Sequence, residues 1–394
     1  MFILRIFYGL YLTLRRLSLI FTAQYAEYIM YIYEQHDWPQ FKWDTLKFLS
    51  LLTEVRNLQG RVIGKMGNLG FDLKDIANLE MLTQDVLKSS EIEGEMFNPD
   101  QVRSSVARQL GLDLVGLIPS DKNVDGVVEM LINASEHYDK PLNKDRLFAW
   151  HRLLFPSGYS SIFDVHAGEW RDDSNGPMQV ISGPIGKEKV HFQAPNANVL
   201  ETEMQNFFEW LNDEQDLDLV LRSAVAHLWF VTLHPFEDGN GRIARTISDM
   251  QLARSNNQSY RFYSMSAQIR KERKQYYDIL EETQKGTLDI TNWIIWYLHC
   301  LLNALESSEN ILKTVIFKNN FWQDNASNII NERQRKILNR LLGGFEGKLT
   351  SSKWANITKC SQDTASRDIQ DMINKHILYK LPGGGRSTGY DLIK

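Results

Sequence analysis

The chain contains the stretch His234-Pro235-Phe236-Glu237-Asp238-Gly239-Asn240-Gly241-Arg242-Ile243-Ala244-Arg245. An apolar segment with helical periodicity, residues 221–233, precedes it. Pro235 ends that helix, because proline lacks an N–H group and disfavours helical dihedrals at the residue before it. Residues 238–241 predict a tight turn whose two glycines allow positive φ and a close approach of the backbone to a ligand. Arg242 and Arg245 then lie three residues apart at the start of a second helix and share one face.

The polar groups of this stretch fit a polyphosphate site. Free N–H groups at a helix N-terminus, a glycine-lined turn and two guanidinium groups all bind anions. Asp238 can hold a Mg²⁺ ion that bridges phosphates, because this ion needs few protein carboxylates, and His234 is the natural proton acceptor. Taken singly, each feature is more often a cap, a turn or a solvated helix face. Their combination within twelve residues favours the functional interpretation.

The stretch resembles the core motif of the Fic family, HPFx(D/E)GNGRxxR, and matches it at every defined position. The resemblance implies transfer of AMP from ATP to a protein hydroxyl. It implies that His234 is the general base, that Asp238 is the Mg²⁺ ligand, and that the 239–241 turn is an anion hole. Arg242 and Arg245 are implied to contact the β- and γ-phosphates. The ATP-binding residues expected in this stretch are Asp238, Gly239, Asn240, Gly241, Arg242, Ile243, Ala244 and Arg245.

A second motif lies at residues 89–94, after a helix-periodic run at 76–88, and Gly94 is placed as a helix terminator. On the residues alone, the carboxylates at this helix end are most often solvated surface. The motif nevertheless matches the family's inhibitory pattern, (S/T)xxxE(G/N), through Ser89, Glu93 and Gly94. The resemblance implies that Glu93, itself counted among the ATP-site residues, pairs bidentately with Arg245 in place of the γ-phosphate. ATP would then be misaligned for in-line attack, and Glu93 would also support the removal of AMP.

Two short runs rich in β-branched and aromatic residues, 178–181 and 189–192, flank Ser182-Gly183-Pro184-Ile185-Gly186 and predict a β-hairpin. One interpretation is a surface hairpin without a partner. The resemblance favours a flap that covers the nucleotide and docks the target segment by strand addition. It therefore adds four residues to the expected ATP site: Ser182, Gly183, Pro184 and Ile185. Upstream of the core, residues 167–171 resemble the family's Gly-aromatic-Arg segment.

A later helix, predicted over residues 270–282, contains Tyr276 and Tyr277. The resemblance implies that an aromatic pair at this point lies against the adenine and that a nearby Asn contacts the nucleotide. Gln284 occupies the position of that Asn, which is a departure from the family pattern. The residues themselves leave core packing and adenine contact equally open for the two tyrosines. All three residues are included in the predicted ATP site.

The N-terminal region begins to resemble family sequence directly after Met30. Residues 31–44 resemble the domain of unknown function that precedes one Fic subgroup, and we expect them to pack as a buried plug. A helix is predicted over residues 45–66. Its apolar stripe consists of Leu46, Leu49, Leu52, Val55, Leu58 and Val62.

Residues 1–29 are apolar but are interrupted by Arg5, Arg15 and Arg16, and no run reaches the roughly 20 apolar residues of a membrane span. A secretory signal and an interfacial helix are two interpretations. We favour a third, in which natural translation begins at Met30 and the extension is non-native or disordered. No membrane partner is expected.

Residues 331–394 contain 12 Lys and Arg and 6 Asp and Glu, so this part carries a net charge of +6 within a chain of net charge -5. Three short helices and a β-hairpin formed by 377–381 and 390–393 around 383–386 resemble a winged helix-turn-helix domain. Four polar side chains lie at the front of its third helix, where major-groove contacts are made: Gln362, Thr364, Ser366 and Arg367. Binding to DNA and binding to protein remain equal alternatives.

The composition, 43% apolar and 24% charged over 394 residues, is ordinary for a globular protein of two or three domains. Cys300 and Cys360 lie far apart and give neither zinc-site nor disulfide spacing, which suits the cytoplasm. We therefore predict a mainly α protein: a Fic-fold helical bundle with a β-hairpin flap and a C-terminal winged helix-turn-helix domain. The predicted domains are 30–110 with the inhibitory helix, the Fic core at 111–310, and the winged helix at 331–394.

The predicted activity is transfer of AMP from Mg²⁺-ATP to a Ser, Thr or Tyr hydroxyl of a target protein or of the chain itself, restrained by Glu93 and Ser89. One alternative is a DNA-binding regulator whose Fic core senses nucleotide, and another is a Fic core that moves a different phosphate-bearing group. The expected partners are a target protein on the 178–192 hairpin and, as open alternatives, a second copy of the chain and DNA.

Overall fold

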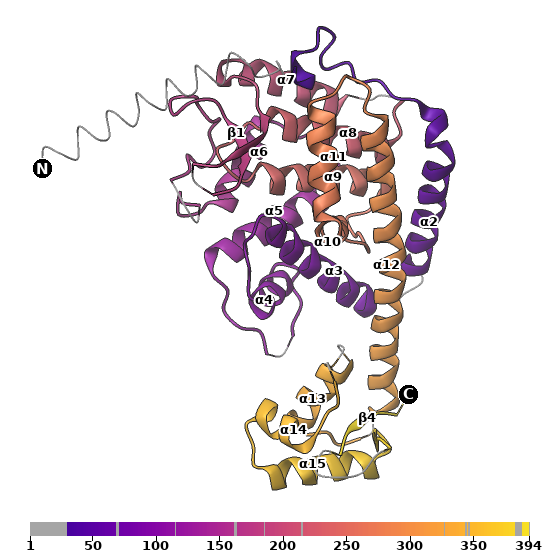
Figure 1. The fold of residues 1–394 in the computed structure, drawn as a ribbon. Coiled ribbons are helices and arrows are strands. Elements are labelled where there is room, and N and C mark those ends of the chain that lie inside the picture. The colour runs from indigo at the N-terminus through magenta and orange to yellow at the C-terminus, as the bar shows by residue number, and fades with distance from the viewer. Residues whose placement is uncertain are drawn as a thin grey trace, which may run out of the picture. The chain divides into compact units, whose positions relative to one another are not determined.

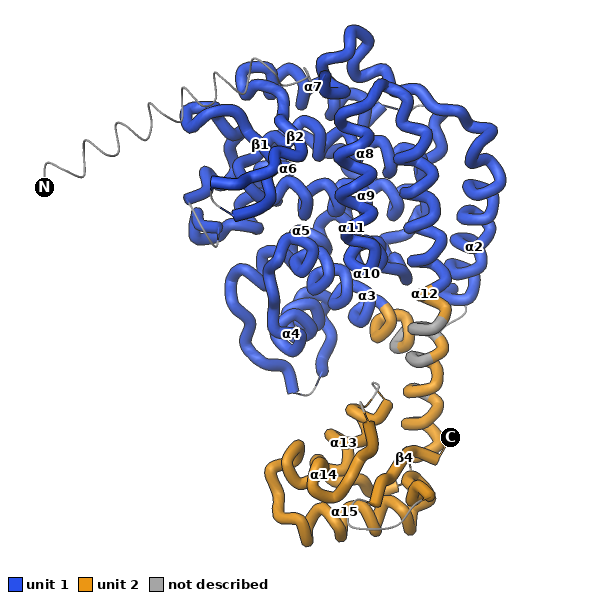
Figure 2. Tube along the Cα trace, viewed as in Figure 1, with its two compact units in different colours: residues 1–68, 78–306 blue, residues 69–77, 307–394 orange. Residues whose placement is uncertain are grey.

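The computed structural model describes residues 30–67, 71–114, 116–160, 164–184, 186–213, 216–326, 328–342, 345, 347–382 and 388–393. The predicted extension at 1–29, Ile185 of the predicted ATP site and residues 383–386 of the predicted wing lie outside these ranges. The chain divides into two compact units, residues 1–68 with 78–306 and residues 69–77 with 307–394 (Figure 2). Among the described residues, no helix has the length and apolar character that crossing a membrane requires.

The N-terminal part of the first unit has two short 3-10 helices, η1 Ile32–Glu34 and η2 Thr45–Lys47, followed by α2 Leu49–Gly67. Phe48 has φ -131° and interrupts the single helix that was predicted from residue 45. The apolar stripe shifts accordingly: Val55, Leu58 and Val62 are buried, whereas Leu46 and Leu49 are exposed, so their predicted burial was wrong. The expected plug is only partly buried, with Trp38 and Phe41 packing edge-on against Trp229 at ring distances of 6.1 and 5.7 Å.

Helix α3, Phe71–Ile92, runs four residues beyond the predicted end at Lys88, so Ser89 and Ser90 are helical and buried. It ends at Gly94, which has φ 90° as its predicted terminator role requires. The Glu95 N–H bonds to the Ser90 carbonyl at 3.0 Å and the Gly94 N–H to the Glu91 carbonyl at 3.2 Å. These two bonds form a Schellman motif, which fixes the direction in which the chain leaves the helix.

The centre of the first unit is the pair α8 Leu219–Leu233 and α9 Asn240–Asn256, which pack against each other (Figure 1). Residues 220–233 of α8 are all buried, as expected for a helix that is apolar on every side. Helices α4 Pro99–Gln109 and α6 Lys144–Leu154 pack against α5 Lys122–Glu136, which itself contacts α9. Helix α7 Leu200–Asn212 follows η3 Ala197–Val199 and packs against α8.

The predicted helix at 270–282 is two helices, α10 Met265–Lys271 and α11 Arg273–Gln284. Glu272, with φ -102° and ψ 23°, separates them, because these dihedrals do not continue a helix. The next helix, α12 Thr291–Asp324, continues into the second unit.

The predicted flap is a two-stranded antiparallel hairpin, β1 Gln179–Ser182 and β2 Lys189–Gln193. Ser182 pairs with Lys189 and Val180 with Phe192. Both strands lie mostly at the surface, and Phe192 is their buried anchor. The hairpin therefore exposes backbone and side-chain groups while Phe192 anchors it to the protein interior.

The second unit contains α13 Glu332–Leu342, α14 Ser351–Thr358 and α15 Gln362–Asn374, followed by the antiparallel strands β3 Leu378–Lys380 and β4 Tyr390–Leu392. Thr350 and Ser361 cap α14 and α15, each accepting a backbone N–H. The unit has its own apolar core, which includes Ile337, Leu338, Trp354, Ile369, Met372 and Leu392. The order of elements is the predicted one, and the winged helix-turn-helix assignment stays a prediction. The chain as a whole is mainly α, as predicted.

Candidate active site

The turn between α8 and α9 places the motif's functional groups. His234 ends α8 in the left-handed region at φ 49° and ψ 56°, and Pro235 follows it. Gly239 has φ 80° and precedes the first residue of α9, as predicted. Gly241 does not use the positive φ that glycine allows, because the helix has already begun at residue 240. Glycine at 241 leaves room for Glu93 instead, since a Cβ there would overlap the Glu93 carboxylate as it stands.

The turn is held rigid by side chains beneath it. The Phe236 N–H donates to Asn240 Oδ1 at 3.0 Å, and Asn240 Nδ2 donates back to the Phe236 carbonyl at 2.8 Å. This pairing occupies the Asn240 side chain, so only its backbone N–H remains to meet an anion. His151 stacks on Phe236 with ring centroids 4.0 Å apart and supports the turn from below.

The protonation of His151 follows from its partners. The Gly168 N–H donates to its Nδ1 at 2.9 Å, so Nε2 carries the hydrogen and donates to the Asp238 carbonyl at 3.2 Å. Burial lowers the pKa of His151 to about 4, which keeps the ring neutral at neutral pH. Sequence reasoning missed this residue, because a histidine within an amphipathic helix carries no motif.

His234 has the tautomer that a general base requires. Its Nδ1 lies 3.2 Å from the Val231 carbonyl, which can only accept, so Nδ1 carries the hydrogen and Nε2 keeps its lone pair. Burial lowers the pKa of His234 to about 4 and outweighs the hydrogen bond to Val231, so the imidazole is neutral at neutral pH. Arg171, from the segment ahead of the core, donates from Nε to the His234 carbonyl at 2.7 Å and so fixes the backbone of His234.

The two motif arginines are both buried and both engaged by the end of α3. Arg245 donates from Nε to Ser89 Oγ and from Nη2 to the Ser89 carbonyl, each at 3.0 Å, and from Nη2 to Glu93 Oε1 at 2.8 Å. The predicted bidentate pairing with Glu93 was wrong, because only Nη2 reaches the Glu93 carboxylate, while Ser89 takes Nε and shares Nη2, and Nη1 has no partner among the described residues. Arg242 donates from Nη1 to Glu95 Oε2 at 2.7 Å.

Glu95 is a site residue that sequence reasoning missed. Burial raises its pKa, which the neighbouring Asp238 and Glu93 carboxylates raise further while Arg242 lowers it. The available signal was the third carboxylate at the end of the helix, two residues after Glu93 and directly after the terminating glycine. The segment 89–95 therefore contacts both motif arginines rather than one.

A cleft of ≈ 830 Å³ opens beside these groups. His234, Asp238 and the 239–241 turn line one side, and Glu93 reaches it from α3. The hairpin and α11 contribute the other lining residues, which include Ser182, Phe192, Tyr276, Tyr277 and Gln284. Arg242, Ile243, Ala244 and Arg245 are buried behind the turn, and Gly183 and Pro184 lie exposed at the hairpin tip.

The two tyrosines differ in their surroundings. Tyr276 is buried, and its hydroxyl lies 2.9 Å from Nε2 of the buried His227, so it packs in the core while one face meets the cleft. Tyr277 is 37% exposed and lies beneath the Arg273 guanidinium at 5.2 Å. Gln284 donates to Thr232 Oγ1 at 3.3 Å and to the Val231 carbonyl at 3.4 Å, close to His234.

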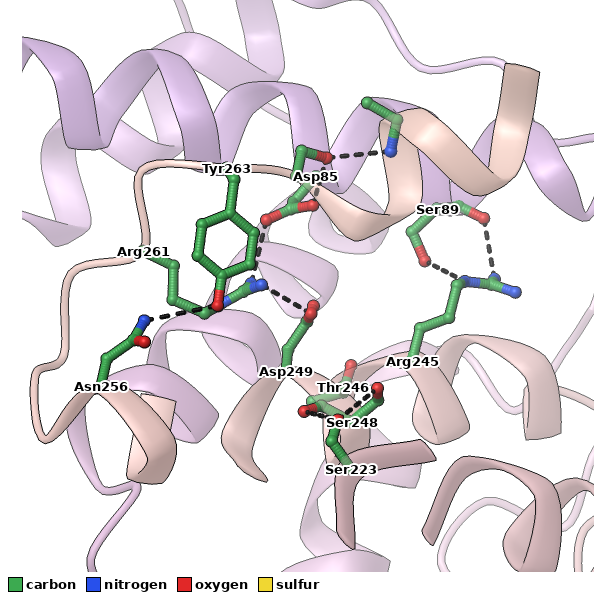
Figure 3. A network of polar contacts seen from close by, with 12 residues as sticks. Asp85, Ser89, Ser223, Arg245, Thr246, Ser248, Asp249, Asn256, Arg261 and Tyr263 are labelled. Atoms are coloured by element: carbon green, nitrogen blue, oxygen red, sulfur yellow. Dashed lines mark hydrogen bonds and ion pairs between the residues drawn. The ribbon is translucent and has the colours of Figure 1, made fainter. Parts of the chain in front are cut away.

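A buried ionic cluster joins α3 to α9 (Figure 3). Arg261, in the loop after α9, donates to Asp249 of α9 at 2.6 Å and to Asp85 of α3 at 3.0 Å. Ser264 also donates to Asp85, at 2.5 Å. Burial, together with the nearby Asp85, raises the pKa of Asp249 to about 7, although Arg261 acts to lower it. The cluster holds the helix that carries Ser89 against the helix that carries Arg245, and no local sequence pattern predicts it.

Comparisons with known proteins agree with the motif. Residues 31–112 match a domain of unknown function, DUF4172, and residues 141–252 match the Fic/DOC family. The chain is 27% identical over 240 residues to the Protein adenylyltransferase Fic of Drosophila mojavensis, covering 58% of this chain and 42% of that protein. It is 26% identical over 241 residues to the protein of the same name from Culex quinquefasciatus, with the same shares. The chain thus spans less than half the length of these curated relatives.

Among solved structures, a Fic domain containing signaling protein from Bacteroides thetaiotaomicron superimposes with a TM-score of 0.50 at 20% identity. The superposition covers 67% of this chain and 95% of that one. At this identity the likeness concerns the fold alone, and it agrees with the helical bundle around α8 and α9. Residues 141–252 are therefore similar to the Fic/DOC family, and residues 31–112 ahead of them are similar to DUF4172.

Proposed function

We propose that the chain is a protein adenylyltransferase that moves AMP from Mg²⁺-ATP to a Ser, Thr or Tyr hydroxyl and is restrained by the segment 89–95. One observation carries the proposal. A neutral His234 with a free Nε2 lines the same cleft as Asp238 and the glycine turn, while Arg245 behind that turn is held by Ser89 and Glu93. The names of the curated relatives support this reaction.

In this proposal His234 Nε2 takes the proton of the acceptor hydroxyl. The hydroxyl oxygen attacks the α-phosphorus, the bond to the β-phosphate bridging oxygen breaks, and pyrophosphate leaves with the electron pair. The backbone N–H groups of residues 240 and 241 stabilise the charge on the phosphates, because they lie at a helix N-terminus that faces the cleft, whereas the Gly239 N–H donates to Asp238.

The site has a place for Mg²⁺ at Asp238. This carboxylate is partly exposed at the cleft, and its Oδ1 accepts the Gly239 N–H at 2.6 Å, which fixes its orientation. One carboxylate suits a Mg²⁺ ion whose other ligands are phosphate oxygens and water. Bound there, the ion would neutralise phosphate charge and orient the leaving group.

The restraint follows from competition for buried cations. Arg242 and Arg245 have side chains no more than 3% exposed, and each pairs with a carboxylate from the segment 89–95. A phosphate that reaches Arg245 must displace Glu93, because both ligands need the same guanidinium. Until that happens, the α-phosphorus stays out of line with the acceptor, and Glu93 in place is also suited to support removal of AMP.

The target protein is proposed to dock on the hairpin at 178–192. Both strands are short and lie mostly at the surface beside the cleft, and an exposed strand edge pairs with an extended segment of another chain. The same placement explains how a hydroxyl on that segment would come within reach of His234.

A DNA-binding regulator remains the second candidate. Gln362, Ser366 and Arg367 lie exposed on the first two turns of α15, and residues 331–394 carry a net charge of +6. A gel shift of the full chain with genomic DNA fragments, repeated over a salt series, tests this role, because phosphate contacts weaken steeply as salt rises.

The reaction is tested by incubating the chain in lysate with ATP labelled at either the α- or the γ-phosphate. Compared with lysate alone, Glu93→Gly is expected to add α label to lysate proteins and no further γ label, and adding His234→Ala to that chain is expected to abolish the added α label on those proteins. Mass spectrometry of the labelled peptides then identifies the acceptor. Absence of added α label with Glu93→Gly, or added γ label, contradicts the proposal.

A further inference from the structure

Three polar side chains at the hairpin form a hydrogen-bonded chain that the proposed reaction does not use. Ser182 Oγ lies 2.6 Å from His191 Nε2, and His191 Nδ1 lies 2.5 Å from Glu281 Oε2. Ser182 ends β1, His191 belongs to β2, and Glu281 comes from α11. Because Ser182 pairs with Lys189, His191 is its diagonal neighbour on the same face of the hairpin.

The partners define where the protons lie. A carboxylate can only accept, so His191 Nδ1 carries a hydrogen and donates it to Glu281. His191 Nε2 is then a lone-pair acceptor, and the Ser182 hydroxyl donates to it. Burial alone would raise the pKa of Glu281, but hydrogen bonds from Lys285 and His191 lower it to about 2, so this carboxylate is ionised at neutral pH. A hydroxyl bonded to an imidazole that a carboxylate orients is an activated nucleophile.

The hairpin does not depend on this chain of contacts. Its strands are joined by their own backbone ladder, and the buried Phe192 anchors β2 in the protein interior. Ser182 is exposed, and Ser182, His191 and Glu281 all line the cleft that His234 and Asp238 line. An activated hydroxyl is therefore presented to the space in which the nucleotide is proposed to bind.

We propose that Ser182 is an acceptor of AMP within its own chain, with His191 as the base for this step. The inference rests on the proposed function and names one acceptor for it. Ser182 Oγ forms a bond to the α-phosphorus of ATP, its proton passes to His191 Nε2, and the bond to the β-phosphate oxygen breaks as pyrophosphate leaves. The product is a phosphodiester that removes the Ser182–His191 hydrogen bond and places a negative charge on the hairpin.

The test incubates the full chain carrying Glu93→Gly with Mg²⁺ and ATP and maps AMP by mass spectrometry of the digested protein. AMP is expected on the peptide that contains Ser182. Ser182→Ala removes it and Ser182→Thr restores it. Ser174→Ala is the matched control, because Ser174 is an exposed serine whose hydroxyl donates to Asp172 at 2.6 Å rather than to a histidine.

The two supporting residues predict different kinetics. His191→Gln is expected to slow modification of Ser182 by about 100-fold or more, a usual contribution of a general base. His36→Gln, which alters an exposed histidine paired with Asp37 at 2.9 Å, is its control. Glu281 is a positioning residue, so Glu281→Gln should lower the rate at saturating ATP and leave the KM for ATP unchanged. The rate constant per chain should not depend on protein concentration.

The outcomes separate this inference from the proposed function. If the Glu93→Gly chain places AMP on other hydroxyls but not on Ser182, the inference is overturned and the proposed function stands. If Glu93→Gly places AMP neither on its own chain nor on any lysate protein, both are overturned. An unchanged rate in His191→Gln, or a rate constant that rises with protein concentration, also overturns the inference.

Discussion

At the scale of single residues, the site depends on which atoms are free. The Val231 carbonyl accepts the Nδ1 hydrogen of His234, and the side-chain amide of Asn240 is bonded to the backbone of Phe236. The groups that face the cleft are therefore an imidazole nitrogen and backbone N–H groups. Gly241 shows that a motif glycine can be required by another residue's side chain, here Glu93, rather than by its own dihedrals. The sequence identifies these residue types, but it does not show which of their atoms are already bonded.

The pKa of His234 predicts an unusual pH profile for a histidine-dependent reaction. Burial lowers this pKa to about 4, and because Glu93 raises it slightly, Glu93→Gly should lower it further. The imidazole therefore stays unprotonated, and the initial rate of AMP incorporation by Glu93→Gly should be constant from pH 8 down to about pH 6. Rates measured across this range in one mixed buffer check it. Loss of half the rate near the ordinary histidine pKa of about 6.5 would count against a desolvated base.

At the scale of elements, the sequence predicted the helices well where they are amphipathic or apolar. Helix α8 ends at the predicted residue because Pro235 follows it, and the 178–192 hairpin forms as its turn residues indicate. The end of α3 was less predictable, since Ser89 and Ser90 are poor helix formers and the tertiary contacts of Ser89 with Arg245 support the helix there. The same contacts, made across about 150 residues, are what place Glu93 and Glu95 on the two motif arginines.

The Asp85–Arg261–Asp249 cluster is predicted to hold α3 against α9. Arg261→Met removes the cation and leaves two buried carboxylates without it, which should cost about 3–5 kcal/mol of the free energy of unfolding. Urea unfolding of the full chain measures this cost. Lys274→Met is the control, because Lys274 pairs with Asp278 at a highly exposed position and should give no measurable change. A loss for Arg261→Met no larger than that of the control would show that the cluster does not stabilise this helix pair.

At the scale of the whole molecule, the proposed AMP transfer and the proposed DNA contacts belong to different compact units. All residues that line the cleft belong to the first unit, from Glu93 to Gln284. The second unit has a separate apolar core, which the shift in composition after residue 331 indicated. Helix α12 continues into the second unit, which the sequence did not predict. The apolar spacing of this helix does not change where one unit ends and the other begins.

Removing the second unit's C-terminal part should therefore leave the chemistry intact. A Glu93→Gly chain that ends after Asp324 keeps all of α12 and every residue of the cleft. Its rate of AMP incorporation is expected to equal that of the full-length Glu93→Gly chain, with circular dichroism as the check on folding. A folded truncated chain that no longer incorporates AMP would show that residues 325–394 contribute to the reaction.

In the proposed function, Glu93 and the γ-phosphate of ATP compete for Arg245. The most direct measurement compares initial rates of AMP incorporation for the unaltered chain, Glu93→Gln and Glu93→Gly at saturating Mg²⁺-ATP. We predict that Glu93→Gly is faster than the unaltered chain by about 100-fold, as expected when a misaligned phosphate becomes aligned. Glu93→Gln should lie between them, because its amide still fills the space but carries no charge. Equal rates for all three would contradict the claim.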